Sequence, residues 1–482
     1  MKTILNYMNG ELTPPAGGRY LDNEDPSTGK VYSRCPDSGA EDIERAVAAA
    51  EAAFPAWSNT SAEMRGRVMS RIADLIEANL DPLAEAECID NGKPITLARK
   101  VDIPRAAANF RFFAGAIQHA ASEAHMTDGL ALNYTQRRPR GVAGLISPWN
   151  LPLYLLTWKV APAIATGNTA VAKPSEVTPM TAFLLSQLCT EAGLPPGVLN
   201  VVHGRGPAAG AALVAHPRVP TISFTGGTVT GAAIASTCAP MFKRLSLELG
   251  GKNPNVIFAD ADLDQAVATS MRSSFANQGQ ICLCGSRILV ERPAFEPFVA
   301  RLVEGASKLS AGDPLDPATE HGALVSRPHM EKVLACIEVA RREGGEILCG
   351  GRRVQPPGQR CAGGYFIAPT VITGLGPSCR TNQEEIFGPV VTVAPFDDEQ
   401  EAVASANETR YGLSATVWTR DLARAHRVAG AIQSGTVWVN CWLLRDLRVP
   451  FGGMKHSGLG REGGEDSMRF FTEPKNVCIG MR

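Results

Sequence analysis

The chain has 482 residues, of which 44% are hydrophobic and 20% are charged, and its net charge at pH 7 is −1. This balance is ordinary for a soluble globular protein and gives a nucleic-acid or polybasic membrane role no electrostatic support. No apolar run approaches the roughly 20 residues of a membrane helix, and the N-terminus shows no secretory pattern. We therefore expect a cytoplasmic protein of roughly two to four domains whose cysteines are reduced.

The first long segment, residues 41–87, is predicted to form amphipathic helices that pack on the lobe that follows. From about Arg140 short apolar runs alternate with helical stretches. Strands are expected at residues 141–147, 168–176, 198–204, 221–227 and 244–251, and helices at 161–167, 178–193, 207–216 and 228–243. Thr178 and Gly193 are expected to cap one of these helices. This alternation predicts a parallel sheet covered on both faces.

A second α/β series begins after Gly251, with apolar runs at residues 253–263 and 362–373. The chain is therefore predicted to have two α/β lobes.

Two polar turns follow predicted strands of the first lobe. The dinucleotide fingerprint G-x-G-x-x-G is absent, but Gly226 and Gly227 precede a helix whose free N–H groups would suit a phosphate. Such glycine turns are also common without a ligand. Lys173 and Glu176 follow another strand, where they form either a solvated loop or a pair that binds a ribose diol.

The segment FANQGQICLC brings two cysteines, Cys282 and Cys284, one residue apart. No second cysteine pair or regularly spaced histidine completes a zinc site, and the spacing is not that of a C-x-x-C redox motif. We predict no metal. From the residues alone, Cys282 is either a nucleophile with a neighbour or one of two core thiols.

Several motifs together resemble the aldehyde dehydrogenase family and span almost the whole chain. In order, they are SPWNLP, AKPSE, SFTGGT, LELGGKNP, FANQGQIC, EEIFGPV and PFGGMKHSG. The resemblance implies that Cys282 is the nucleophile, Glu248 the general base and Asn150 the oxyanion donor, while Cys284 has no catalytic role. The thiolate would add to the aldehyde, hydride would pass to NAD, and water activated by Glu248 would release the acid.

The same resemblance implies an NAD site and an architecture. The expected cofactor contacts are Trp149, Lys173, Glu176, Gly226, Gly227, Glu385 and Phe387, with Glu176 favouring NAD over NADP. Where many relatives have Ser, this chain has Gly227. The contact of that serine side chain with the phosphate would therefore be lost, and backbone groups would have to replace it. The expected parts are a Rossmann-type NAD-binding domain (1–118 and 139–248), an α/β catalytic domain (249–460) and a small β arm (119–138 and 461–482). The arm implies a homodimer or homotetramer.

The segment 439–453, VNCWLLRDLRVPFGG, resembles the branch of this family that oxidises muconic semialdehydes. Arg105 and Arg445 fall at positions that imply contact with the substrate, whose carboxylate two guanidiniums could bind. We expect 2-aminomuconate 6-semialdehyde, with 2-hydroxymuconate semialdehyde as the alternative. If both arginines instead form surface ion pairs, the substrate is a general aliphatic, aromatic or retinoid aldehyde. A CoA-acylating enzyme or a non-catalytic structural member is disfavoured because Glu248, Cys282 and Asn150 are all present.

Overall fold

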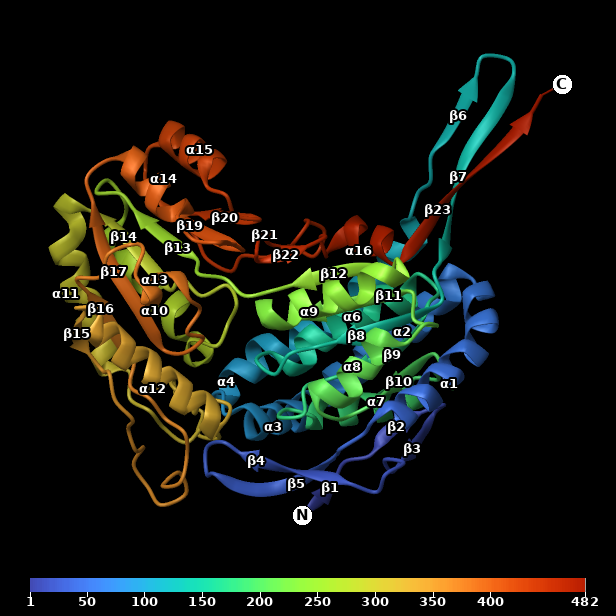
Figure 1. Cartoon of the computed structure of the whole chain (residues 1–482), viewed down its shortest axis with the longest axis horizontal. Coiled ribbons are helices and arrows are strands. Elements are labelled where there is room, and N and C mark those ends of the chain that lie inside the picture. The colour runs from blue at the N-terminus through green and yellow to red at the C-terminus, as the bar shows by residue number, and fades with distance from the viewer. Residues whose placement is uncertain (482) are drawn as a thin grey trace.

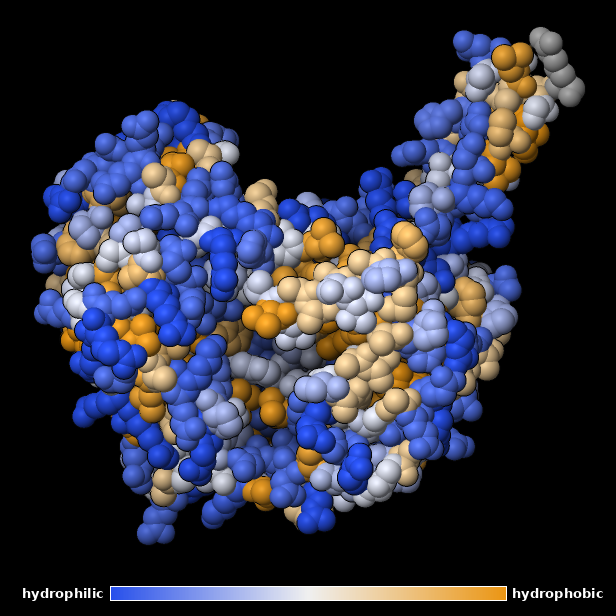
Figure 2. All heavy atoms as spheres, viewed as in Figure 1, coloured by the Kyte–Doolittle hydropathy of each residue, from blue (hydrophilic) through white to orange (hydrophobic). Residues whose placement is uncertain are grey.

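The structure is a computed structural model that describes residues 1–481 as two α/β lobes and a projecting β arm (Figure 1). On the face shown in Figure 2, the surface is hollowed between the two lobes. No helix in the described chain is long and apolar enough to cross a membrane.

The first lobe is built on an eight-stranded sheet. Its spatial order is β22 (Gly458–Leu459), β12 (Arg244–Glu248), β11 (Thr221–Thr225), β8 (Val142–Ile146), β9 (Thr169–Lys173), β10 (Leu199–Val201), β2 (Asn6–Met8) and β3 (Glu11–Thr13). The five strands from β12 to β10 are parallel, and antiparallel strands flank them. The predicted strands between residues 141 and 251 are therefore confirmed. Their carboxyl ends meet at one edge of the sheet, where ligands bind in such folds.

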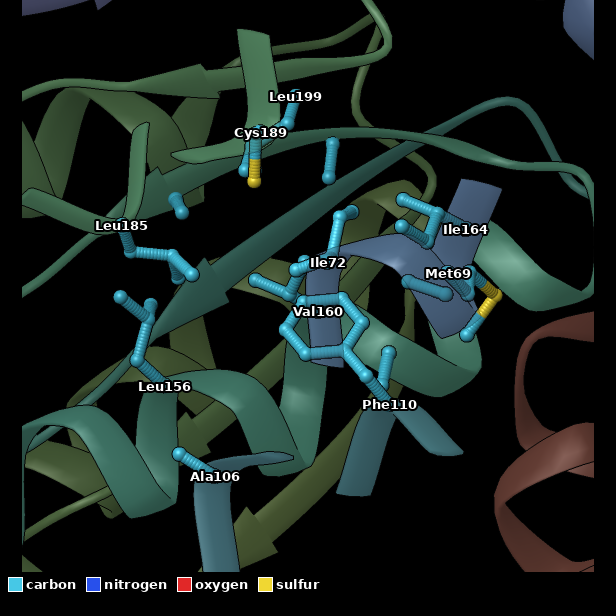
Figure 3. Close-up of a cluster of buried hydrophobic side chains, with 14 of the residues drawn as sticks. Met69, Ile72, Ala106, Phe110, Leu156, Val160, Ile164, Leu185, Cys189 and Leu199 are labelled. Atoms are coloured by element: carbon cyan, nitrogen blue, oxygen red, sulfur yellow. The ribbon is translucent and has the colours of Figure 1, made fainter. Parts of the chain in front are cut away.

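Helices cover both faces of this sheet, as predicted. One face carries α2 (Ala62–Ala78), α5 (Ile103–Ala116), α6 (Pro152–Ala165) and α7 (Met180–Glu191), and the other α1 (Ala40–Asn59), α8 (Ala211–Ala215) and α9 (Thr228–Cys238). Figure 3 shows the first of these cores, where Ile72, Phe110 and Val160 from three helices meet. Strand β9 serves both cores because Ala170 faces one and Val171 the other.

The N-terminus of α7 differs from its prediction. Thr178 does not cap this helix, since its hydroxyl has no partner in the described chain and the helix begins at Met180. Instead, Asp90 at the end of α3 (Leu80–Asn91) accepts a hydrogen bond of 2.7 Å from the Met180 N–H. The negative end group that favours a helix start is thus supplied by another helix. Gly193, with φ +82°, follows the end of α7 as expected.

The second lobe has a seven-stranded sheet. Its order is β15 (Glu346–Cys349), β16 (Thr370–Thr373), β17 (Val390–Phe396), β14 (Arg287–Glu291), β13 (Pro254–Ile257), β19 (Ser414–Trp418) and β20 (Thr436–Val439). Helices α10 (Leu263–Phe275) and α11 (Arg292–Lys308) pack on one face, and α12 (Arg327–Arg342), α14 (Glu399–Asn407) and α15 (Leu422–Ala431) on the other. The predicted second α/β lobe is confirmed.

The arm consists of β6 (Ala124–Thr127), β7 (Ala131–Pro139) and β23 (Thr472–Gly480), all antiparallel. Within the segment 461–482, which we assigned to the arm, Glu462 and α16 (Gly464–Phe470) instead contact the first lobe. Three strands near the N-terminus, β1 (Lys2–Thr3), β4 (Tyr20–Asp25) and β5 (Lys30–Pro36), form a separate small sheet.

Candidate active site

A cavity of about 1040 Å³ lies between the two lobes, where β11 and β12 end. Four of the predicted site residues line it together: Cys282, Glu248, Arg105 and Arg445. Asn150 lies beside it, next to the lining residue Leu151. These side chains come from distant parts of the sequence, so the fold alone brings them together.

The turn that precedes Cys282 is unusual in its backbone. In the short helix η5 (Ala276–Gly279), Asn277 and Gln278 have positive φ angles of 50° and 55°. After the turn, the Asn253 side chain donates to the carbonyl oxygen of Cys282 at 2.7 Å. Left-handed backbone at non-glycine residues costs free energy and is common at functional sites. This turn therefore fixes where the thiol enters the cavity.

The two thiols of this segment differ in their surroundings. Cys282 is partly exposed and lines the cavity, whereas Cys284 is buried. Burial raises the pKa of Cys282, and the carboxylates of Glu248 and Glu385 raise it further, while Arg445 opposes them. The resting thiol is therefore protonated and needs a nearby base before it can act as a nucleophile.

Asn150 is held from both ends. Its side-chain nitrogen donates to the carbonyl of Gln280 at 3.0 Å, two residues before Cys282. Its own backbone carbonyl accepts hydrogen bonds from the side chains of Lys93, at 3.1 Å, and Asn277, at 3.0 Å. The carboxamide is thus fixed next to the cysteine, as an oxyanion donor must be.

Glu248 ends β12 and is 5% exposed. Burial raises the pKa of this carboxyl to about 8, and the neighbouring Glu462 contributes in the same direction. Glu462 accepts hydrogen bonds from Lys159 Nζ at 2.9 Å and from Ser223 Oγ at 3.0 Å. A carboxyl whose pKa lies near neutral pH can both accept and return a proton.

Lys173 is the last residue of β9, and Glu176 lies three residues after it. Lys173 Nζ donates to the Glu176 carboxylate at 2.9 Å, and the other carboxylate oxygen accepts the Gly206 N–H at 3.4 Å. Burial opposes ionisation of Glu176, but Lys173 and backbone N–H donors together outweigh it, so the pKa of the carboxyl is lowered. The two side chains form one polar unit at the edge where a nucleotide would bind.

Gly226 and Gly227 join β11 to α9 at the same edge. A Cβ atom at Gly226 would lie 2.5 Å from the Phe224 ring, while one at Gly227 would meet open space. The hydroxyl of Thr228, the first residue of α9, has no partner among residues 1–481. An open helix N-terminus with a free donor fits a phosphate group.

Glu385 and Phe387 lie close to Cys282, and Trp149 packs against Phe387. Glu385 and Phe387 line a small space together with Cys282, and Glu385 accepts the Gly251 N–H at 3.0 Å. The rings of Trp149 and Phe387 meet edge to face at 5.2 Å. The predicted contacts for the reactive end of a cofactor thus lie next to the thiol.

Arg105 and Arg445 share one aromatic corner of the cavity. Arg105 lies over Tyr154 at 5.6 Å and over Trp158 at 6.0 Å, while Arg445 lies over Phe451 at 3.8 Å and over Trp158 at 5.4 Å. The Arg105 Nε and Nη2 atoms are buried without a hydrogen-bond partner in the described chain. Neither arginine forms an ion pair with any described carboxylate, so the alternative in which both form surface ion pairs does not hold.

Sequence reasoning missed several residues of this site. Glu462 lies in the segment we assigned to the arm. Lys159, Trp158 and Tyr154 lie in the part of α6 that precedes residue 161, where we expected this helix to begin. One signal was available. In α6, Lys159 is the single charged residue of an otherwise apolar run, and a fully buried lysine requires an acceptor. In the part of the chain described, no three metal-ligating side chains gather.

The comparisons with known proteins can be set beside this geometry. The model of the aldehyde dehydrogenase family matches residues 13–477. The chain belongs to this family. It is 56% identical to 2-aminomuconic semialdehyde dehydrogenase of Danio rerio, over 99% of this chain and 98% of the relative. It is 50% identical to 2-hydroxymuconic semialdehyde dehydrogenase of Pseudomonas sp. strain CF600, over 99% and 100%.

A solved aldehyde dehydrogenase of Bacillus cereus, described as an NAD+ complex, has the same fold, with a TM-score of 0.97 and 40% identity over 100% of this chain and 97% of the other. The fold and family predicted from the motifs are therefore confirmed, and so is the prediction of an NAD-dependent aldehyde dehydrogenase.

Proposed function

We propose that this enzyme oxidises a muconic semialdehyde to the dicarboxylate with NAD, with 2-aminomuconate 6-semialdehyde as the favoured substrate and 2-hydroxymuconate semialdehyde as the alternative. Both compounds carry a carboxylate at the end away from the aldehyde. The names of the two relatives at 56% and 50% identity support this substrate class.

The observation that carries the proposal is the pair of unpaired guanidiniums in the cavity. Arg105 is partly exposed, but its Nε and Nη2 atoms are buried, and burial lowers its pKa, so its charge is costly where it stands. Arg445 donates to the Tyr154 hydroxyl at 3.1 Å and otherwise faces aromatic rings. A planar guanidinium binds a carboxylate with two parallel hydrogen bonds. A substrate carboxylate would supply the negative charge that these two guanidiniums lack.

At the other end of the substrate, Cys282 would add to the aldehyde carbon and form a tetrahedral thiohemiacetal. The Asn150 carboxamide and the Cys282 backbone N–H would donate to its oxyanion. The raised pKa of Cys282 requires a proton acceptor, and Glu248 lines the same cavity. After oxidation, Glu248 would take a proton from water, which attacks the thioester and releases the acid.

The residues at the edge of the first sheet fit NAD. Lys173 and Glu176 would bind the adenosine ribose, and the turn at Gly226 and Gly227 would bind the pyrophosphate. Glu385, Phe387 and Trp149 would hold the nicotinamide end beside Cys282. Bound there, NAD supplies the acceptor for the hydride. Glu176 would repel a 2′-phosphate, so NAD is preferred over NADP.

We further propose the division into an NAD-binding domain, a catalytic domain and an arm, and an assembly of two or four copies. The arm projects away from both lobes (Figure 1), and Figure 2 shows apolar surface along it. Its exposed apolar side chains include Met126, Leu130 and Ile479. Exposed apolar strands of this kind commonly pair with a second chain. A reducing cytoplasm suits a protein whose twelve cysteines are all unpaired.

The test compares Arg105→Ala and Arg445→Ala on 2-hydroxymuconate semialdehyde and on benzaldehyde, a neutral aldehyde. Each variant should lose roughly ten- to a hundredfold in kcat/KM on the acid, because a charge-assisted hydrogen bond is lost, and little on benzaldehyde. Arg448→Ala is the matched control, since Arg448 is exposed and paired with Asp446. Equal losses on both substrates would reduce the assignment to an unspecified aldehyde.

A further inference from the structure

A second charged cluster borders the substrate cavity and has no part in the chemistry described so far. Lys93, Glu87 and Asp102 have fully buried side chains, with Lys93 Nζ 2.5 Å from an Asp102 oxygen and 3.3 Å from a Glu87 oxygen. Glu87 lies in α3, Lys93 in the loop after it, and Asp102 at the end of the π-helical turn η1 (Ala98–Asp102). A buried ammonium is stable only between such acceptors.

On one side, the cluster holds the backbone around Asn150. Lys93 Nζ donates to the Asn150 carbonyl at 3.1 Å, and Glu87 accepts the Leu153 N–H at 3.2 Å. Leu153 lies in the first turn of α6, three residues after Asn150. The ammonium and its carboxylate therefore fix the strand-to-helix turn that carries the oxyanion donor.

On the other side, the cluster holds the start of α5. Asp102 directly precedes this helix, and Arg105 lies in its first turn, three residues further on. Asp102 and Arg105 both line the substrate cavity. A π-helical turn widens the backbone locally and is frequent at functional sites. Any shift of Asp102 is thus passed to the guanidinium one turn along the same rigid helix.

The charges of the cluster also favour a fixed geometry. Burial alone would lower the pKa of Lys93, but the carboxylates of Asp102 and Glu87 outweigh it and raise the pKa. Burial raises the pKa of Glu87 to about 7. The lysine therefore stays charged, and it donates hydrogen bonds to both of its carboxyl partners.

Resting on the proposed function, we propose that Lys93 is a positioning residue that sets the separation between Asn150 and Arg105, and hence between the aldehyde end and the carboxylate end of the substrate. One ammonium ties together the two segments that carry these groups. A semialdehyde with a rigid conjugated chain requires that separation to be fixed, because a misplaced carbonyl loses the alignment with Cys282.

The experiment is a double-mutant cycle between Lys93→Met and Asn150→Ala, measured as kcat on benzaldehyde. In the wild-type background, Lys93→Met should reduce kcat roughly tenfold or more, because the donor to the Asn150 carbonyl is lost. In the Asn150→Ala background, the same change should cost about threefold or less. A loss of equal size in both backgrounds would overturn the proposal. Because benzaldehyde has no carboxylate, this result does not depend on the substrate assignment.

The second arm measures KM for 2-hydroxymuconate semialdehyde, which should rise in Lys93→Met more than KM for benzaldehyde does. Lys243→Met is the matched control, because Lys243 is also buried and also donates to two backbone carbonyls, at 2.6 Å each, but lies remote from the cavity. That variant should lose stability without a change in either KM.

If Lys93→Met is recovered only as aggregate, Asp102→Asn replaces it, since it keeps the lysine and the side-chain size. That variant should lose roughly three- to tenfold in kcat/KM on the acid and less on benzaldehyde, as the hydrogen bond to the ammonium is weakened on the Arg105 side. A greater loss on benzaldehyde than on the acid would contradict the proposal.

Discussion

The positive charges in and around the substrate cavity are compensated in different ways. Lys93 and Lys159 are fully buried, and each lies within hydrogen-bond distance of a carboxylate of the chain. Arg105 and Arg445 lie against aromatic rings, and no described carboxylate pairs with either. An unpaired charge away from water is costly, so we propose that Lys93 and Lys159 organise the protein, whereas Arg105 and Arg445 bind a charged ligand.

The largest expected effect concerns the thiol of Cys282, the predicted nucleophile. Cys282→Ser should lose NADH formation by on the order of a thousandfold or more, because a serine hydroxyl is a far weaker nucleophile here. Cys284→Ser should keep most of the activity, since Cys284 is buried away from the cavity. Steady-state NADH absorbance checks both variants. The reverse pattern would assign the nucleophile to Cys284.

The next effect concerns the base. Glu248→Ala should still give one burst of NADH per site, followed by turnover slowed roughly a hundredfold, with a thioester accumulating on Cys282. In the wild type, deacylation should rise with pH through about 8 and level off above it, because the base acts only when ionised and its pKa is raised to about 8. Rapid-mixing kinetics across roughly pH 6–9, which extends about one unit above that pKa, measures the burst and the deacylation rate. Loss of the burst itself would mean that Glu248 is needed earlier, to ionise Cys282.

The contrast between paired and unpaired cations can also be tested by introducing a carboxylate next to Arg445. Phe451 lies 3.8 Å from the Arg445 guanidinium, so Phe451→Glu would supply the carboxylate that the site lacks. The internal carboxylate should compete with substrate and reduce kcat/KM on 2-hydroxymuconate semialdehyde by roughly ten- to a hundredfold relative to Phe451→Gln. The glutamine variant controls for the lost ring. An equal kcat/KM in these two variants would indicate that Arg445 does not bind the carboxylate.

The smallest effect concerns the cofactor. Glu176→Gln should narrow the preference for NAD over NADP by roughly three- to tenfold, because it removes a partly exposed like charge near the 2′-position. Comparing kcat/KM for the two cofactors gives this ratio directly. Equal kinetics with both cofactors in the unmodified enzyme would refute the role of Glu176.

Much of the fold could be predicted because its signals are local. The strands from 141 to 251 each show an apolar run bounded by a turn, and the family motifs are short segments. The missed features all depend on contacts between distant segments. The cap of α7 is Asp90, 90 residues before Met180, and Glu462 reaches Lys159 from 303 positions away.

In the site, too, residues that act through contacts between distant segments could not be predicted from the sequence. Family motifs pointed to Cys282 and Glu248, and the cavity contains both. No motif pointed to Lys93, which donates a hydrogen bond to the Asn150 carbonyl, 57 positions away. A buried lysine can be suspected from an apolar context, but its acceptor cannot be identified until the segments are placed in space.

The most direct test of the central claim compares 2-hydroxymuconate semialdehyde with its methyl ester, an aldehyde of the same conjugated skeleton without the negative charge. The wild-type enzyme should prefer the free acid by roughly ten- to a hundredfold in kcat/KM, and the double variant Arg105→Ala/Arg445→Ala should show almost no preference. A wild type that oxidises acid and ester equally well, or a double variant that keeps the full preference, would contradict the claim that these arginines bind the substrate carboxylate.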